Sequence, residues 1–149
     1  MRGLSFVVDG ELFVVDITLV QKVARKMTVS PVRTAPDAVV GIANLKGSVI
    51  TLPSLYILLG RKERRVQDRI AEIVNAVIFK SHSGSEDQMG LIIDETGGLV
   101  DISEEIIRPP TLATGAEESV CISGIADVDS KLYRIISVDS IIRRFRNDE

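Results

Sequence analysis

The chain has 149 residues, which suits one compact domain or two small lobes that share a core. Its net charge of −3 argues against a dedicated nucleic-acid binder. The single cysteine, Cys121, excludes an intramolecular disulfide and fits a reducing compartment. The sequence opens without a signal-peptide pattern, and no apolar run approaches the roughly 18 residues of a spanning helix. We therefore expect a cytoplasmic protein that does not insert into a membrane.

The composition predicts a mainly β protein with an aliphatic core. Valine and isoleucine contribute 18 residues each, tryptophan is absent, and aromatic residues make up only 4% of the chain. Both abundant residues branch at Cβ, which restricts χ1 and suits a pleated, half-buried surface.

The first half of the chain reads as strands, turns and one short helix. Residues 6–15 form a predicted hairpin, because the Asp9-Gly10 pair supplies the positive φ angles of a tight turn. Residues 41–45 and 48–52 look like two strands joined at Lys46-Gly47. A short helix is predicted over residues 55–59.

The second half begins after a break in composition. Residues 61–72 hold five basic and three acidic side chains with little β pattern, which indicates a charged connector. Strands are predicted at 73–80, 89–94, 121–127 and 132–136, followed by a C-terminal helix over 138–145. Ser103 is predicted to cap a helical turn that begins with Glu104 and Glu105. We therefore divide the single domain into a first lobe (1–60), the connector (61–72) and a second lobe with the C-terminal helix (73–149).

Short sequence matches suggest that the two halves are related. Asp16-Ile17-Thr18 returns as Asp101-Ile102-Ser103, and Gly41-Ile42-Ala43 returns as Gly124-Ile125-Ala126, in the same order. We interpret the halves as two small β-barrels, because closing a sheet removes exposed strand edges. A lobe of this size is marginal alone, so the two lobes are expected to share an apolar interface.

Residues that could carry catalysis are scarce. His82 is the only histidine and lies in a serine- and glycine-rich loop without a nucleophile-elbow motif. Cys121 begins a Val/Ile-rich strand, where a buried, unreactive thiol is expected. One histidine and one cysteine do not make a zinc site, and the glycines form no phosphate-binding loop. We expect neither a metal nor a cofactor, and no enzymatic activity.

Two alternative functions remain open at this point. An enzyme could use the acidic residues Asp94, Glu95, Asp101, Glu104 and Glu105 as paired carboxylates, but no aromatic sugar platform accompanies them. A small β-barrel could bind nucleic acid or another ligand through the basic run at residues 61–65, but that run is interrupted by an acid and lacks aromatic residues.

The ordered set of motifs resembles the CheW family of chemotaxis coupling proteins. The strongest part contains Ala35-Pro36, Val40-Gly41, Asn44-Leu45-Lys46-Gly47 and Ile50 in the spacing of the family. The resemblance covers nearly the whole chain, over residues 6–16, 20–23, 31–59, 90–94, 106–110, 124–126 and 131–132.

This resemblance implies a fold of two five-stranded, SH3-like β-barrel lobes around a shared core. It implies a non-catalytic adaptor that binds the cytoplasmic tip of a methyl-accepting chemoreceptor and the regulatory domain of a CheA-type histidine kinase. The protein would then be a monomer when free, would bind no nucleic acid, and would work at receptor arrays on the inner face of the membrane.

Carried over by position, the receptor-binding groove would include Val20, Lys22, Val23, Asn44 and Lys46. Gly41 and Gly47 would shape the backbone there, because glycine permits turns and close approach. Core packing is an equally good interpretation of the two valines.

Three positions depart from the family pattern. The family usually has an acid at the position of Lys22, arginine at Lys46 and aspartate at Ser54. In similar proteins the first two side chains lie close enough to pair, whereas two lysines repel each other weakly. These departures concern the expected groove more than the core.

Overall fold

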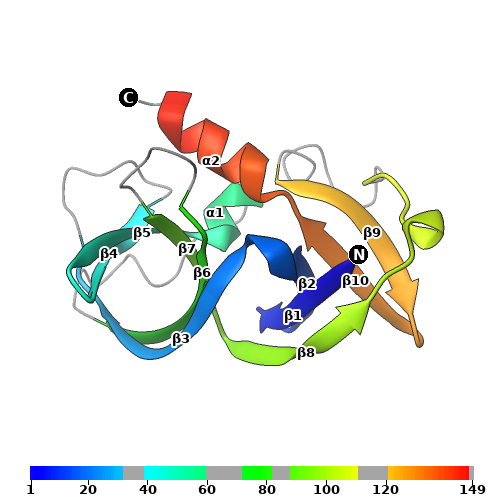
Figure 1. Ribbon diagram of the computed structural model, residues 1–149, viewed down its shortest axis with the longest axis horizontal. Helices are drawn as coiled ribbons and strands as arrows, with labels where there is room; N and C mark the ends of the chain where they lie inside the picture. The colour runs from blue at the N-terminus through cyan, green and yellow to red at the C-terminus, as the bar shows by residue number, and fades with distance from the viewer. Residues whose placement is uncertain (32–38, 60–71, 82–87, 111–120, 148–149) are drawn as a thin grey trace. The chain divides into compact units, whose positions relative to one another are not determined.

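The computed structural model describes residues 1–31, 39–59, 72–81, 88–110 and 121–147 (Figure 1). The strands in these residues are β1 (Arg2–Val8), β2 (Glu11–Asp16), β3 (Val20–Val29), β4 (Val39–Leu45), β5 (Ser48–Pro53), β6 (Glu72–Phe79), β7 (Gln88–Ile93), β8 (Glu95–Asp101), β9 (Ile122–Val128) and β10 (Lys131–Ile136). The helical elements are η1 (Ile17–Leu19), α1 (Leu55–Leu58), η3 (Glu104–Ile106) and α2 (Val138–Asn147). The predicted β fold with a short helix and a C-terminal helix is confirmed. His82 and residues 61–71 of the predicted connector lie outside the described residues.

The strands form two five-stranded sheets that belong to two compact units. The terminal unit combines Met1–Leu19 with Asp94–Glu149 and has the strand order β8-β1-β2-β10-β9. The central unit is Val20–Ile93 and has the order β3-β6-β7-β5-β4. The predicted lobe boundaries therefore differ from the observed ones. The chain changes unit after Leu19 and again after Ile93, because the first hairpin pairs with β8 and β10 from the far end of the sequence.

One isolated bridge joins the two outermost segments of each sheet. In the central unit, Ser30 beyond β3 pairs with Ile42 of β4 through backbone bonds of 2.8 and 2.9 Å. In the terminal unit, Arg108 beyond β8 pairs with Ile125 of β9 through two bonds of 2.9 Å. These bridges connect the ends of both sheets, as expected for small barrels that protect their edges.

Tight turns fix the register of three hairpins. Asp9-Gly10, Lys46-Gly47 and Asp129-Ser130 all have positive φ angles, which match a type I′ turn and the twist of the flanking strands. The first two were predicted from their Asp-Gly and Lys-Gly pairs. The third contains no glycine, so both of its residues hold a left-handed conformation that side chains disfavour.

Each unit has an aliphatic core. The core of the central unit includes Val29, Ile50, Leu52, Ile78 and Ile92. In the terminal unit, Phe6 and Phe13 are fully buried and stack with a ring-centroid distance of 5.8 Å. Burying a phenylalanine side chain contributes about 1.5–3 kcal/mol, so these cores stabilise the sheets that carry the surface features described below. Among the described helices, none is long and apolar enough to cross a bilayer.

The predicted repeat corresponds only in part to equivalent positions. Gly41 and Gly124 are equivalent, because each lies one residue before the bridge that joins the ends of its sheet. The two Asp-Ile motifs end β2 and β8, which take different places in the sheet orders. Their similarity is local, since each is followed by a 3-10 turn. Ser103 takes the predicted N-cap position of the second turn, with Glu104 and Glu105 following it, but its side chain makes no capping hydrogen bond.

Candidate functional site

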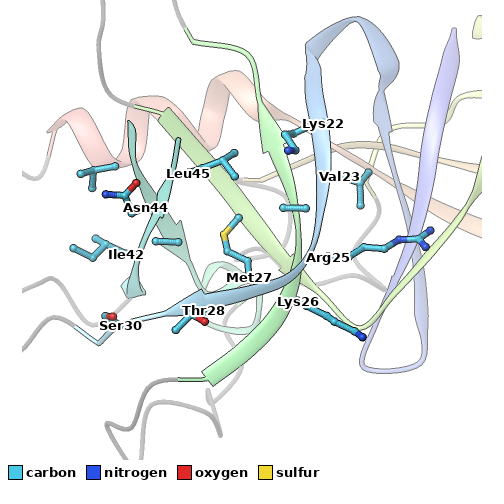
Figure 2. Close-up of a pocket in the computed structure, with 13 residues that line it drawn as sticks. Lys22, Val23, Arg25, Lys26, Met27, Thr28, Ser30, Ile42, Asn44 and Leu45 are labelled. Atoms are coloured by element: carbon cyan, nitrogen blue, oxygen red, sulfur yellow. The ribbon is translucent and has the colours of Figure 1, made fainter. Parts of the chain in front are cut away.

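The central unit has a surface hollow of about 630 Å³ between β3 and β4 (Figure 2). Its lining comes from one stretch of β3 and the residue that follows it, from β4, and from the start of β5. The lining residues are Lys22, Val23, Ala24, Arg25, Lys26, Met27, Thr28, Ser30, Ile42, Ala43, Asn44, Leu45 and Val49.

The hollow exists because β3 turns away from β4 beyond their single bridge (Figure 2). The register of β3 against β6 shifts between Ala24 and Met27, which marks a bulge, and Lys26 within it has a φ of +55°. The amide of Lys26 donates a 3.2 Å hydrogen bond to the Asn75 side chain on β6. Bulges increase local twist and bend a strand, so this bulge accounts for the divergence.

The hollow combines an apolar interior with cationic side chains. Met27, Ala24 and Ala43 are buried, and Met27 and Leu45 lie between the two strands in Figure 2. Val49 is 54% exposed, although it is a large aliphatic side chain. The charged lining residues are Lys22, Arg25 and Lys26, and the described lining includes no acid. Arg25 and Lys26 extend from β3 on the side away from β4 in this view, so their charged ends lie outside the hollow.

The structure brings together three of the five groove residues expected from the resemblance. Lys22, Val23 and Asn44 all line the hollow. Val20 is half-buried at the start of β3, and Lys46 is exposed in the β4–β5 turn, so both lie outside the lining. Sequence analysis missed Arg25, Lys26, Met27 and Val49. Only Val49 falls on a predicted strand, because no strand was predicted over residues 20–29, where β3 and its bulge open this surface.

The two glycines expected to shape the backbone have distinct physical roles. A Cβ atom on Gly41 would lie 2.4 Å from the carbonyl oxygen of Ser30. Any side chain there would force apart the seam of the central barrel, which is the place where Ser30 pairs with Ile42 and joins the ends of the sheet. Gly47 has a φ of +86° in the β4–β5 turn, and its amide donates a 3.0 Å bond to the Asn44 side chain. Gly41 thus permits close approach, and Gly47 permits the turn.

Ser54 has a structural role that explains one departure from the family pattern. It is buried at the start of α1, and its hydroxyl oxygen accepts a 3.3 Å bond from the Ile57 amide. Serine and aspartate are both favourable helix N-caps. The replacement of aspartate by serine therefore preserves a cap and leaves the hollow unchanged.

The other candidate chemical residues have structural surroundings. Cys121 is 1% exposed, in keeping with the predicted buried thiol. The Asp94 carboxylate accepts a 2.7 Å bond from the Asp9 amide, and Asp101 pairs with Arg2 at 2.9 Å. The Arg2 guanidinium lowers the pKa of Asp101, first through this hydrogen bond and then through Coulomb attraction. Within the part of the chain that the structure describes, no three His, Cys, Asp or Glu side chains are grouped to hold a metal.

The two units carry opposite net charges. The terminal unit has 7 basic and 15 acidic residues, a net charge of −8. The central unit has 11 basic and 6 acidic residues, a net charge of +5. The overall charge of −3 therefore conceals a basic unit that contains the hollow. Such a unit attracts acidic partners at a distance set by the ionic strength.

Comparisons with known proteins agree on one family. The model of the CheW-like domain matches residues 2–146. The chemotaxis protein CheW of Rhizobium meliloti is 27% identical over 93% of this chain and 84% of its own length. The chemotaxis protein CheW of Bacillus subtilis is 21% identical over 95% of this chain and 86% of its own length. The crystal structure of the scaffolding protein TtCheW from Thermoanaerobacter tengcongensis aligns with a TM-score of 0.74 at 26% identity, covering 92% of this chain and 88% of that one.

Proposed function

Since this chain belongs to the family of CheW-like domains, which are chemotaxis scaffold proteins, we propose that it couples chemoreceptors to a CheA-type histidine kinase without catalysing a reaction itself. The family match over residues 2–146 carries this proposal, because it covers both units. The protein would act in the cytoplasm at receptor arrays and would be a monomer when free.

The surface of the central unit supports a binding function. A scaffold needs exposed surfaces that recognise other proteins, and partly apolar hollows lined in part by charged residues are suited to this task. Lys22, Val23 and Asn44 line such a hollow. We assign them, with Val20 and Lys46 nearby, to the surface that binds the cytoplasmic tip of the receptor.

The departures at Lys22 and Lys46 suggest which partners this protein prefers. Both side chains are cationic here, and Lys46 is exposed in the turn. Lysine is a flexible point charge without the planar fork that arginine offers to carboxylates. The partners of this protein would therefore carry an acidic residue opposite these two lysines. The partners of relatives that have an acid and an arginine at these positions would present a different surface there.

Co-purification tests the proposal most simply. The tagged protein should retain the CheA-type kinase of its own organism, and addition of the receptor tip should produce a complex of all three. A variant with Ser130 replaced by glycine is the control, because this turn belongs to the terminal unit and the assigned residues belong to the central unit. Retention of neither partner by the folded protein would contradict the proposal.

A further inference from the structure

The seams of the two barrels are closed differently, although they occupy equivalent places. In the terminal unit, the bridge between Arg108 and Ile125 is reinforced by an ion pair of 2.5 Å between Arg108 and Asp127. The equivalent residues in the central unit are Ser30 and Asn44, since Ser30 makes the bridge and Asn44 lies two residues after the bridged Ile42. Neither carries a charge, so this ion pair has no counterpart in the central seam.

The strand ladder at the central seam stops after one pair. Ser30 and Ile42 form a hydrogen-bonded pair, because they exchange two backbone hydrogen bonds. If the antiparallel ladder continued, the next hydrogen-bonded pair would be Thr28 and Asn44. Alternation along a strand directs their backbone N–H and C=O groups toward the seam rather than toward β6 and β5. The two residues instead lie apart on the walls of the hollow (Figure 2), and no backbone bond joins them among the described residues.

We propose that the seam between β3 and β4 binds an extended, acidic segment of a partner protein, which pairs as an added strand with the backbone of Thr28 or Asn44. Strand addition uses main-chain hydrogen bonds for affinity and alternate side chains for specificity. The proposal stands independently of which protein supplies the segment.

The lining defines the chemistry of this segment. Aliphatic side chains on one face of the segment would contact Met27 and Leu45 in the interior of the hollow. Carboxylates on the other face of the segment would lie on the outer side of β3, where Lys26 points, and the net charge of +5 of the central unit favours an acidic segment. Alternation of acidic and aliphatic residues, which a strand places on opposite faces, satisfies both requirements.

A synthetic peptide provides the test. The probe is a nine-residue, end-blocked peptide that alternates valine with glutamate, and its binding is measured by fluorescence anisotropy at low salt. We expect saturable binding, at least tenfold weaker binding of the same peptide with lysine in place of glutamate, and binding that weakens as salt is added. Two further peptides are N-methylated on alternate amides, so that each lacks the N–H donors along one edge of the strand. At least one of them should bind at least tenfold more weakly than the unmethylated peptide.

Protein variants locate the binding site. The double change Lys22→Glu with Lys26→Glu should weaken binding at least tenfold. Lys80→Glu with Lys131→Glu alters the net charge equally at residues that do not line the hollow, and it should leave binding within threefold. If the first variant does not fold by circular dichroism, Lys22→Gln with Lys26→Gln replaces it, with an expected loss of about threefold or more. Amide shifts in the NMR spectrum should be largest at Thr28 and Asn44.

Several results would overturn the inference. These are no binding of the acidic peptide, equal binding of both N-methylated peptides, equal losses in the two charge-reversal variants, or amide shifts centred outside β3 and β4. Equal binding of a single-stranded oligonucleotide at the same residues would show a general anion site rather than a strand-binding seam.

Discussion

The carbonyl oxygen of Ser30 lies 2.4 Å from the position that a Cβ atom on Gly41 would take. This close approach occurs beside the single bridge that joins β3 to β4, and the obstructing atom belongs to the backbone. The seam of the central barrel therefore depends on a missing side chain. The same relationship holds in the terminal unit, where the Cβ of a substituted Gly124 would lie 3.0 Å from the Arg108 oxygen.

Replacing Gly41 with alanine should destabilise the protein by about 1–3 kcal/mol, because a methyl group there forces the backbone to move. Urea denaturation monitored by circular dichroism measures the effect. Gly98→Ala is the matched control, since a Cβ at Gly98 meets no atom within 4 Å and the change should stay within about 0.5 kcal/mol. Equal stabilities of the two variants would contradict this account of the seam.

Replacing Ser130 with glycine should stabilise the protein by about 0.5–1 kcal/mol. Ser130 has a φ of +67°, and relief of left-handed strain of about 1–2 kcal/mol exceeds the entropic cost of glycine, about 0.5–1 kcal/mol. The same substitution at Ser48, at the start of β5, should instead destabilise by about 0.5–1 kcal/mol. Thermal unfolding of both variants checks the prediction, which fails if Ser130→Gly lowers the melting temperature.

The ion pair between Arg2 and Asp101 predicts a pH dependence. Arg2 lowers the pKa of Asp101 in the folded protein. The pair therefore stabilises the protein above the pKa that Asp101 has in the unfolded chain, and this contribution is lost as the pH falls through the lower pKa of Asp101 in the folded protein. Because both side chains are exposed, the effect on stability should be small. An NMR titration of the Asp101 carboxyl carbon should give a higher midpoint in Arg2→Ala than in the wild type. Identical midpoints would show that the pair does not form in solution.

Lys22 and Lys46 give the most direct test of partner choice. Changing Lys22→Glu together with Lys46→Arg should weaken binding to the protein's own receptor tip and improve binding to the tip recognised by a relative with the acid–arginine pair. A surface pair of this kind is worth only about 0–1 kcal/mol, so the double variant should fold normally. Calorimetric titration of both proteins against both tips makes the comparison. Unchanged affinities would remove these positions from the determinants of specificity.

Much of the fold was predictable because its signals are local. The turns at Asp9-Gly10 and Lys46-Gly47, the β-branched runs and the C-terminal helix all follow from neighbouring residues. The placement of the first hairpin in the same unit as the C-terminal strands was not predictable from these signals. It depends on the parallel pairing of Leu12 with Tyr133, which are far apart in the sequence and carry no local mark of their contact.

The candidate site was predictable only in outline. Lys22, Val23 and Asn44 came from the family resemblance, and the structure places them on one hollow. Arg25 and Lys26 were missed because the β3 bulge, with Lys26 at positive φ, turns the strand away from β4. Nothing in the residues around Lys26 distinguishes this bulge from a regular strand. Ser54 seemed to be a departure at the groove, but its buried position makes it a helix cap.

Coupling of receptors to the kinase can be measured as the autophosphorylation rate of the organism's CheA-type kinase, reconstituted with receptor tips in the presence and absence of this protein. Coupling predicts that the receptor tips change the kinase rate at least several-fold only when this protein is present. The same response to receptor tips with and without the folded protein would contradict the account.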